Sequence, residues 1–243
     1  MIKNMFDRIF SFLALTILSP LLFTIAIVIY LTDFHSPFYV ANRVGLNGKL
    51  FPMIKFRSMR KGADKTGVDS TSANDTRITP IGHFIRRYKI DELSQLINVF
   101  IGTMSLVGPR PNVKRETDLY TKEEKEILTV KPGITDLSSI VFSDEGNILA
   151  DEKDPDLAYN QLIRPWKSRL GIFYINHRSV FLDFYIIWLT VLNFFNRQSS
   201  LNKIYEYLRR NCADQELYQV VLRKEKLVPT APPGATEIVR NRS

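Results

Sequence analysis

Residues Ile9–Leu31 form an uncharged, apolar stretch of 23 residues close to the N-terminus. As an α-helix it would be about 34 Å long, at about 1.5 Å per residue, and would reach across the hydrocarbon core of a bilayer. The stretch is too long for the apolar region of a signal peptide, and no small-x-small cleavage pattern precedes Asp33. It therefore predicts a helix that is embedded in a membrane.

Ser19-Pro20 stands in the middle of this stretch. Proline removes a backbone donor and clashes with the preceding turn, and the Ser19 hydroxyl can bond the carbonyl that loses its partner. Cations flank the stretch on both sides, Lys3 and Arg8 before it and Arg43 after it. Since the positive-inside rule then favours neither orientation of a straight span, we predict a bent, re-entrant hairpin with both ends in the cytoplasm. A straight single-pass anchor is the alternative.

A second apolar stretch, Val180–Phe195, has 16 residues and contains Asp183 and Asn193. It is too short to span a bilayer comfortably, and a carboxylate inside it makes a span less favourable still. Its many aromatic residues suit an interfacial helix in the headgroup region. A buried core helix explains the same composition equally well.

The remaining sequence predicts a mostly helical, compact cytosolic part with a small β element. Residues 38–44 and 50–57 have the composition of two short strands around the turn signal of residues 45–48, Gly-Leu-Asn-Gly. Residues 61–77 are rich in Asp, Ser, Thr, Gly and Lys, which predicts a mobile loop.

Two helices are expected next, over residues 80–88 and 91–102. In the second, four apolar residues repeat at i, i+3, i+4 and i+7, so one face should pack on the core. Those residues are Leu93, Leu96, Ile97 and Phe100. The sequence Val-Gly-Pro-Arg-Pro at 107–111 then ends the helix in a rigid turn.

Capping patterns mark two later helices. Thr121 followed by Glu124 is a capping box for a short helix. A helix over 155–174 begins after Asp154 as its cap, and Pro165 must kink or split it.

The last residues, 229–243, contain Pro-Pro-Gly and no core pattern, so we predict a disordered tail. We divide the chain into a re-entrant membrane helix (1–33), a cytosolic catalytic part with interfacial helices (34–196) and a C-terminal extension (197–243). The single cysteine, Cys212, excludes an intramolecular disulfide and a cysteine-rich metal cluster.

The net charge of +8 is concentrated in two segments. Residues 1–60 carry seven Lys or Arg against two acids, and residues 77–115 again carry seven against two. A basic surface can bind nucleic acid, anionic lipid or a phosphorylated small substrate. Its position beside the apolar stretch favours lipid or phosphorylated substrate.

Asp91-Glu92 is the strongest local signal, because it follows Arg86, Arg87 and Lys89 directly. Acids at a helix N-terminus are stabilised by the helix dipole and need no further role. Acids among cations also suit a diphosphate with a divalent cation, since carboxylates hold the metal while Arg and Lys hold phosphate oxygens. The residues alone leave both interpretations open.

Three other cations are candidates for binding phosphate. Arg110 lies between two prolines, and a planar guanidinium on a stiff turn suits bidentate contact with phosphate or, alternatively, a surface salt bridge. Lys55 and Arg57 project to one face of a strand, which fits phosphate contact or merely a solvated face. The three histidines have no metal-binding spacing, and the chain lacks a Walker loop, a G-x-G-x-x-G motif and a G-x-S-x-G motif.

From Arg43 to Asp183 the chain resembles the bacterial sugar transferases, the monotopic polyprenyl-phosphate phosphoglycosyl transferases. The resemblance includes Ser19-Pro20 and rests on an ordered series of motifs over about 140 residues, which makes it far more specific than a lone acidic pair. The matching segments are 51–59 (FPMIKFRSM), 77–82 (RITPIG), Arg86, 91–99 (DELSQLINV), 102–111 (GTMSLVGPRP), 131–135 (KPGIT), Arg178-Ser179 and Asp183.

The resemblance implies an enzyme of the bacterial inner membrane that acts at its cytoplasmic face. It implies that Asp91 attacks the sugar-bearing phosphorus of a UDP-sugar and expels UMP, and that undecaprenyl phosphate then takes the sugar phosphate. Glu92 is expected to help Asp91 hold Mg²⁺, and Arg86 and Arg110 to bind phosphate oxygens. Membrane lipids are expected partners, nucleic acid is not, and a homodimer is left open.

The chain departs from the family after residue 135, where many members have glycine and a glutamine-containing segment. Here Asp136 follows directly, and Asp144-Glu145 comes soon after. This leaves the reaction class intact and puts the identity of the sugar in question. A catalytically decayed membrane scaffold for glycan assembly is the alternative function, and the intact Asp91, Glu92, Arg86 and Arg110 count against it.

Overall fold

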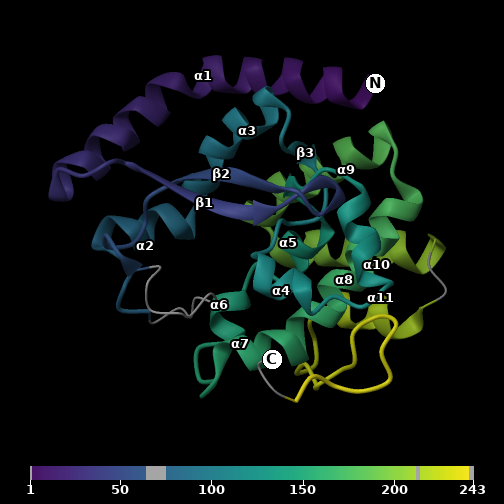
Figure 1. The fold of residues 1–243 in the computed structure, drawn as a ribbon. Helices are drawn as coiled ribbons and strands as arrows, with labels where there is room; N and C mark the ends of the chain where they lie inside the picture. Colours follow the sequence, from purple (N-terminus) through teal and green to yellow (C-terminus); the bar gives the residue numbers. More distant parts are fainter. Residues whose placement is uncertain (1, 64–74, 212–213, 241–243) are drawn as a thin grey trace.

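The structure is a computed structural model that describes residues 2–63, 75–211 and 214–240. It is mostly helical, with two small two-stranded sheets (Figure 1). Most of the loop predicted at 61–77 lies outside the described residues. In chain order the elements are α1 (Ile2–Asp33), β1 (Phe38–Val44), the 3-10 turn η1 (Leu46–Gly48), β2 (Leu50–Phe56), α2 (Pro80–Arg87), the 3-10 helix η3 (Ile90–Gln95), α3 (Leu96–Ile101), β3 (Ser105–Val107), α4 (Lys114–Asp118), the 3-10 helix η4 (Glu124–Thr129), β4 (Gly133–Thr135), α5 (Leu137–Val141), α6 (Glu145–Ile148), α7 (Pro155–Ala158), the π-helix η5 (Tyr159–Ile163), α8 (Arg164–His177), α9 (Val180–Phe195), α10 (Arg197–Asn211) and α11 (Gln215–Val221).

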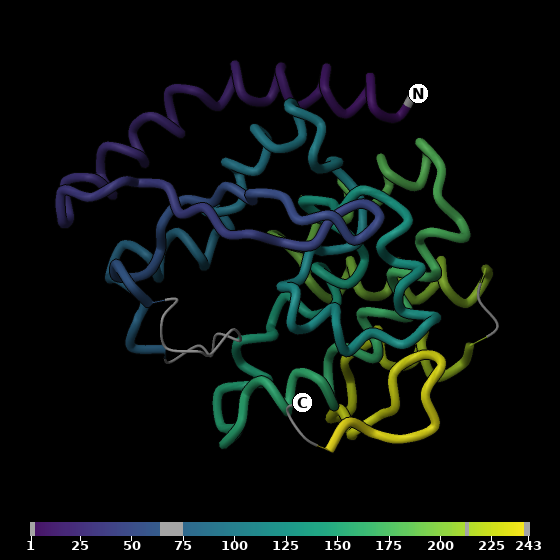
Figure 2. The backbone as a smooth tube through the Cα atoms, in the orientation of Figure 1, coloured from purple at the N-terminus to yellow at the C-terminus, as the bar shows by residue number. Residues whose placement is uncertain are grey.

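The N-terminal apolar stretch is one continuous helix, α1, with Pro20 inside it. Pro20 cannot donate to the carbonyl of Thr16, and the Ser19 hydroxyl donates to that oxygen instead, at 2.8 Å. The helix curves along its length but does not turn back on itself (Figure 2), so the two arms of a hairpin are not seen. The outer face of its middle is exposed, with Ile17 76% and Phe23 69% exposed.

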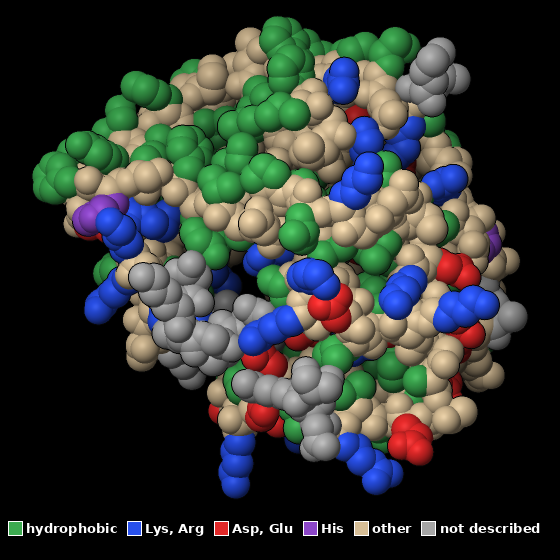
Figure 3. All heavy atoms as spheres, viewed as in Figure 1, with side chains coloured by type: hydrophobic (Ala, Val, Ile, Leu, Met, Phe, Trp, Pro, Cys, Tyr) green, Lys and Arg blue, Asp and Glu red, His purple; other side chains and the backbone are tan. Residues whose placement is uncertain are grey.

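Both ends of α1 are tied to the same body of the protein. At the N-terminal end Lys3 forms an ion pair with Asp183, and Asp7 accepts a hydrogen bond from the Ser105 hydroxyl at 2.8 Å. At the other end both carboxylate oxygens of Asp33 accept bonds from Arg57 at 2.6 Å. The helix therefore lies along one side of the body, and its apolar side chains form a band over the upper part of the molecule (Figure 3).

The strands predicted at 38–44 and 50–57 are confirmed as an antiparallel pair, β1 and β2, which ends one residue earlier, at Phe56. The predicted turn is the η1 segment, where Asn47 and Gly48 have φ of 55° and 75°. Asparagine and glycine tolerate this left-handed conformation better than other residues.

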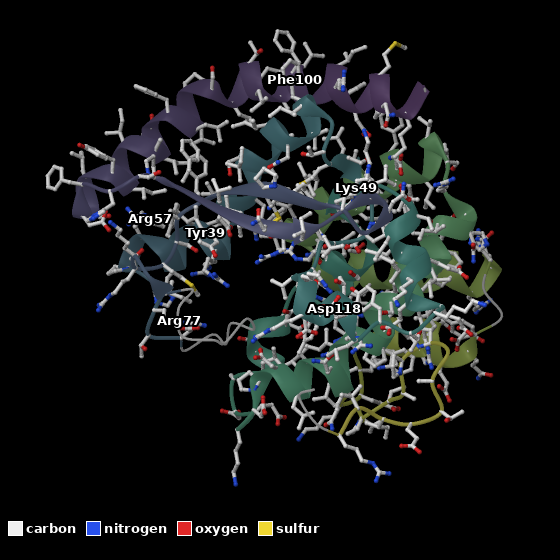
Figure 4. The ribbon with its side chains drawn as sticks, in the orientation of Figure 1. Tyr39, Lys49, Arg57, Arg77, Phe100 and Asp118 are labelled. Atoms are coloured by element: carbon white, nitrogen blue, oxygen red, sulfur yellow. The ribbon has the colours of Figure 1, made fainter. Side chains whose placement is uncertain are left out.

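The helix predicted at 91–102 is split into η3 and α3. Its predicted buried face is confirmed for Leu96, which is 7% exposed, and wrong for Phe100. Phe100 is 46% exposed and lies against α1, with its ring 5.9 Å from that of Phe12 (Figure 4). The polar Asn98 faces the protein instead, because its side chain accepts from the Ile54 amide at 2.9 Å and donates to the Pro52 carbonyl at 2.7 Å. These bonds tie α3 to β2 and leave Phe100 on the side of α1.

The short parallel pair β3–β4 was not predicted. It brings the Gly-Pro-Arg-Pro turn against the Lys-Pro-Gly segment. A Cβ on Gly133 would lie 2.1 Å from the Gly108 nitrogen, so only glycine permits this approach of the two backbones.

The main core joins α5, α8, α9, α10 and α11. The predicted capping box is confirmed, since the Thr121 amide and Glu124 side chain, and the Glu124 amide and Thr121 hydroxyl, each bond at 3.0 Å. Asp154 caps α7 as predicted. The expected disruption near Pro165 is the π-helix η5, which stands between α7 and α8.

The apolar stretch 180–195 is α9, and it combines the two alternatives. One face is buried in the main core and carries Leu182, Asp183, Ile186 and Leu189. The opposite face exposes large apolar side chains, namely Phe181, Phe184, Trp188, Val191, Phe194 and Phe195. Phe184 also packs edge-on against Phe6 of α1, with ring centroids 4.9 Å apart.

The C-terminal residues do not form a separate core, because Leu201, Ile204 and Leu208 belong to the main one. The prediction of a disordered tail from Pro229 is wrong for residues 229–240. The Thr121 hydroxyl donates to the Pro233 carbonyl at 2.5 Å, and this backbone contact gives a segment without helix or strand a defined path over η4.

Candidate functional site

Asp91 and Glu92 lie at the start of η3, between α2 and α3. Lys89 has φ of 53° and acts as the N-cap of η3, so the chain turns sharply before the two acids. The Ser94 hydroxyl lies 3.2 Å from the Ile54 carbonyl of β2. This packing of η3 on β2 turns the acidic pair toward the neighbouring Lys55.

Glu92 is held by two cations. Arg110 Nη2 donates to Glu92 Oε1 at 2.5 Å, and Lys55 Nζ lies 3.6 Å from the same oxygen. Burial acts to raise the pKa of Glu92, but Arg110, Lys55 and Lys89 outweigh it, so this pKa lies well below its usual value. Glu92 is therefore a carboxylate, and its charge keeps Arg110 protonated.

Asp91 differs from its neighbour. Its side chain is buried, with the residue 8% exposed, and no hydrogen bond to its carboxylate is found among the described residues. Burial raises the pKa of Asp91, and the charge of Glu92 raises it further, while Lys55, Arg86 and Arg110 act in the opposite direction. The result is an unpaired carboxylate surrounded by fixed cations.

The site cations are themselves poorly solvated. Burial lowers the pKa of Lys55, and the nearby Arg110 lowers it further. Burial likewise lowers the pKa of Lys89, whose Nζ donates to the Ser139 carbonyl at 3.3 Å. Poorly solvated cations attract an incoming anion more strongly than solvated cations do, because water screens their charge less.

Of the predicted phosphate-binding residues, the structure brings together Lys55, Arg86 and Arg110 but not Arg57. Arg86 Nη1 lies 3.5 Å from the Ser58 hydroxyl and acts electrostatically on Asp91. Arg57 instead forms the bidentate ion pair with Asp33 at the end of α1, where Figure 4 shows it beneath that helix. Strand alternation put Lys55 and Arg57 on one face, but β2 ends at Phe56, so the alternation does not extend to Arg57.

Two further charged residues border the site. Glu145 forms an ion pair with Lys167, and Lys167 offsets the rise that burial gives the pKa of Glu145. Arg110 and Lys89 also act on Glu145 electrostatically. The sequence pointed to Glu145 only as a departure from the family, and no pattern distinguished Lys167 on α8.

The two other acids of the departing segment have structural partners. Asp136 caps α5 by accepting from the Ser139 amide at 2.7 Å. Asp144 pairs with Arg197 at 2.8 Å and with Arg223 at 3.6 Å.

A pocket opens beside Arg110, on the side of α5 and α8. Its empty volume, including the open mouth, is about 340 Å³. Its lining includes the hydrogen-bonding side chains of Asn112, Tyr120, Ser138, Tyr159 and Lys167.

No cluster of three or more His, Cys, Asp or Glu side chains suited to a metal occurs in the described part of the chain. Asp91 and Glu92 are thus the acidic donors of the site itself. Mg²⁺ binds proteins through one or two carboxylates and completes its coordination with water and substrate phosphate. The unpaired Asp91 carboxylate and the adjacent Glu92 fit that donor set.

These features define a mostly helical protein with one long apolar N-terminal helix, consistent with membrane association, and a buried, cation-lined carboxylate site suited to a phosphorylated ligand. The comparison with protein families identifies it further: residues 1–197 match the family described as bacterial sugar transferase. The chain belongs to that family.

Three relatives show what members of the family are named for. The chain is 36% identical over 204 residues to a UDP-glucose:undecaprenyl-phosphate glucose-1-phosphate transferase of Xanthomonas campestris pv. campestris, a match that covers 82% of this chain and 40% of the relative. It is 31% identical over 193 residues to a UDP-N-acetylgalactosamine-undecaprenyl-phosphate N-acetylgalactosaminephosphotransferase of Aeromonas hydrophila, covering 78% and 43%. It is 37% identical over 192 residues to an uncharacterised sugar transferase, EpsL, of Bacillus subtilis (strain 168), covering 78% and 85%.

Proposed function

We propose that this chain transfers a sugar 1-phosphate from a UDP-sugar to undecaprenyl phosphate at the cytoplasmic face of a bacterial membrane and releases UMP. The observation that carries the proposal is the Asp91 carboxylate, buried without a hydrogen-bond partner among the described residues and surrounded by Lys55, Arg86 and Arg110. An unpaired buried anion costs free energy, and a site that binds and reacts with a phosphate ester is a reason to retain it.

The reaction has two displacements at one phosphorus. An Asp91 oxygen attacks the sugar-bearing phosphorus, the bond to the bridging oxygen breaks, and UMP leaves with the electron pair. A phosphate oxygen of undecaprenyl phosphate then attacks the same phosphorus, and the Asp91 carboxylate leaves with its electrons restored. The covalent step divides a difficult transfer between two anions into two easier ones.

Arg110, Arg86 and Lys55 would hold the diphosphate oxygens. Arg110 is the strongest candidate, because its guanidinium suits bidentate phosphate contact and the Pro-Arg-Pro turn restricts its backbone. Its ion pair with Glu92 orients it before the substrate arrives. Positioning and charge neutralisation are the main demands of phosphoryl transfer.

Mg²⁺ would be held by Asp91 and Glu92 together with substrate oxygens. When bound, it would neutralise charge on the diphosphate and on the departing UMP. It would also favour the charged form of Asp91, which burial disfavours.

The re-entrant membrane topology belongs to this proposal. Lys3 and Asp7 at one end of α1, and Asp33 at the other, are all bonded to the body that carries the site. A straight span would put one of these ends on the far side of the membrane, where it could not reach the body. A bent α1 that enters and leaves by the cytoplasmic face keeps both sets of bonds and puts the site at the membrane surface, where a lipid phosphate lies.

The relatives differ in sugar, since one is named for glucose and another for N-acetylgalactosamine. The chain spans 40% of the length of the Xanthomonas relative, so the donor has to be measured directly. UDP-sugars are therefore tested as a panel with Mg²⁺, undecaprenyl phosphate and the protein in nanodiscs, with UMP release as the measurement.

The proposal expects UMP release with at least one donor and its loss in Asp91→Asn. Asp118→Asn is the matched control, because Asp118 is an exposed acid that pairs only with Lys114 in the described structure. Unchanged turnover in Asp91→Asn would remove Asp91 from the mechanism. Absence of UMP release from the wild-type protein with every donor would reject the transferase function.

A further inference from the structure

A buried polar network joins the N-terminal end of α1 to β3. Asp183 of α9 pairs with Lys3 and accepts from the Tyr174 hydroxyl at 2.6 Å. Asp7 accepts from the Ser105 hydroxyl at 2.8 Å, and its second oxygen lies 3.3 Å from the Leu106 amide. The network therefore has two branches, one through α9 and α8 and the other directly from α1.

The two branches meet on a single backbone oxygen, the Val107 carbonyl. The Tyr174 hydroxyl lies 3.2 Å from this oxygen, and the Ser105 hydroxyl lies 2.9 Å from it. Each hydroxyl has one proton, and each faces both a carboxylate and this carbonyl. The Tyr174 proton points to Asp183, the nearer acceptor at 2.6 Å, and the ion pair with Lys3 holds that carboxylate in place.

Val107 is three residues before Arg110, and the chain between them is stiff. Pro109 fixes its own φ, the Gly108 amide donates to the Thr135 carbonyl at 3.1 Å, and the Gly133 amide donates to the Pro109 carbonyl at 3.1 Å. A shift of the Val107 carbonyl is therefore passed on to the turn that carries Arg110.

The network is buried at every member except Lys3: Asp7, Ser105, Tyr174 and Asp183 are each 1–3% exposed. Burying two carboxylates costs free energy unless they are paired, and apolar side chains would pack there at lower cost. Simple stabilisation of the fold does not require two buried acids to bond the two hydroxyls that face one carbonyl, three residues before Arg110.

We infer that Tyr174, Ser105, Asp183 and Asp7 are positioning residues for Arg110, and that through Lys3 and Asp7 the seating of α1 on the body sets the geometry of the anion site. The inference uses the proposed function only for its substrate, because the chain of contacts from α1 to the Val107 carbonyl stands without it. It assigns the membrane helix a part in forming the site, in addition to anchoring the protein.

A double-mutant cycle tests the inference in the full-length protein in nanodiscs. Tyr174→Phe removes one hydroxyl, and we expect about a tenfold fall in kcat/KM for the UDP-sugar, mainly through KM. In an Arg110→Lys background the same change should have less than about a twofold effect, because its target is already impaired. Equal falls in both backgrounds would show a general structural role and overturn the inference.

Two further measurements keep the test independent of turnover. UDP binding by Asp91→Asn should weaken about tenfold when Tyr174→Phe is added, and amide exchange over residues 105–112 should become faster. Lys3→Met, which removes the ion pair with Asp183, should weaken UDP binding, and Lys3→Arg, which keeps a cation there, should not. If UDP binding and exchange at 105–112 stay unchanged in Tyr174→Phe, the inference is wrong even where the transferase activity is confirmed. If the wild type releases no UMP, the proposed function fails. UDP binding and amide exchange at 105–112 still decide the inference in that case.

Discussion

Arg110 Nη2 donates to Glu92 Oε1 at 2.5 Å, whereas the carboxylate of Asp91, the residue next to Glu92, accepts no hydrogen bond within the described structure. The pKa values of these two adjacent carboxyl groups are thus shifted in opposite directions, because burial raises the pKa of Asp91 while cations lower that of Glu92. Neighbouring acids whose pKa values are separated by their surroundings are typical of catalytic sites with divided roles. In the proposed mechanism Glu92 orients the cations, and Asp91 stays available for reaction.

Asp91→Asn should make the protein more stable at pH 7. The raised pKa of Asp91 means that its neutral form favours folding, and this contribution is lost as the pH rises from the ordinary value of 3.8 through the folded value. Asparagine is neutral at every pH, so we expect a gain on the order of 1 kcal/mol, or a rise in Tm of roughly 2–4 °C. Thermal unfolding in detergent with EDTA measures it.

The gain should disappear near pH 3, where Asp91 is protonated in both the folded and the unfolded chain. Asp118→Asn serves as the control, since Asp118 is an exposed acid and should show no such gain. A lower Tm for Asp91→Asn at pH 7 would mean that the carboxylate is stabilised by its surroundings, contrary to the site described above.

Glu92→Gln should lower stability at neutral pH and change its dependence on acid. The depressed pKa of Glu92 means that its contribution is fully present above the ordinary value of 4.5 and is lost as the pH falls through the lower folded value. We expect a cost of about 2–4 kcal/mol at pH 7, because Arg110 and Lys55 lose a buried partner. Below pH 4 the variant and the wild type should converge.

Urea unfolding at a series of pH values gives the comparison. Glu123→Gln is a control, because it removes an acid without an ion-pair partner in the described structure. A constant difference between Glu92→Gln and the wild type from pH 7 to pH 3 would show that the ion pair with Arg110 does not form in solution.

The topology proposed for α1 predicts that both chain ends face the cytoplasm. A cysteine or an epitope tag added at residue 1 should resist an impermeant label in intact cells, as should a tag after residue 243. In Asp33→Asn the pair with Arg57 is lost, and the C-terminal end of α1 should detach more readily, seen as faster amide exchange at 34–37. Labelling of the residue 1 tag from outside would establish a straight span.

The sequence predicts those parts of this molecule that depend on local chemistry. The Ser19–Pro20 compensation, the β1–β2 hairpin and the Thr121–Glu124 capping box each follow from side chains within four residues of one another or from a turn. The positions of the Phe100 and Arg57 side chains depend on partners far away in the sequence. Phe100 packs against Phe12, and Arg57 pairs with Asp33. No periodicity within a short window contains such information.

The candidate site shows the same division. Asp91, Glu92, Arg86 and Arg110 are adjacent to motif residues and were found from sequence, and Lys55 was one of two equal candidates until β2 was placed. Lys167 comes from α8, a helix whose relation to the site is set only when the main core forms. The Tyr174 hydroxyl is likewise visible as a functional candidate only after Val107 and Asp183 are brought to it.

The ion pair between Arg164 and Glu124 should be the most sensitive single point of the main core. Both side chains are almost fully buried, at 2% and 0% exposure. Arg164 Nε and Nη2 donate to the two Glu124 oxygens at 2.9 Å and 2.6 Å, and Nη1 donates to Asn160 at 2.7 Å. Because both side chains are buried away from solvent, Glu124→Gln leaves a guanidinium without its counter-charge, which costs about 3–5 kcal/mol.

The matched change is the paired substitution Glu124→Gln with Arg164→Met, which removes both charges and should recover part of that loss. Denaturant unfolding of the three variants and the wild type measures the recovery, and UDP binding at low denaturant shows whether the site is intact. If Glu124→Gln alone unfolds at the wild-type midpoint, the pair is solvated in the native protein. The capping box at Thr121 would then carry the structural role of Glu124, because its amide bond to Glu124 Oε2 at 3.0 Å survives in glutamine as an acceptor.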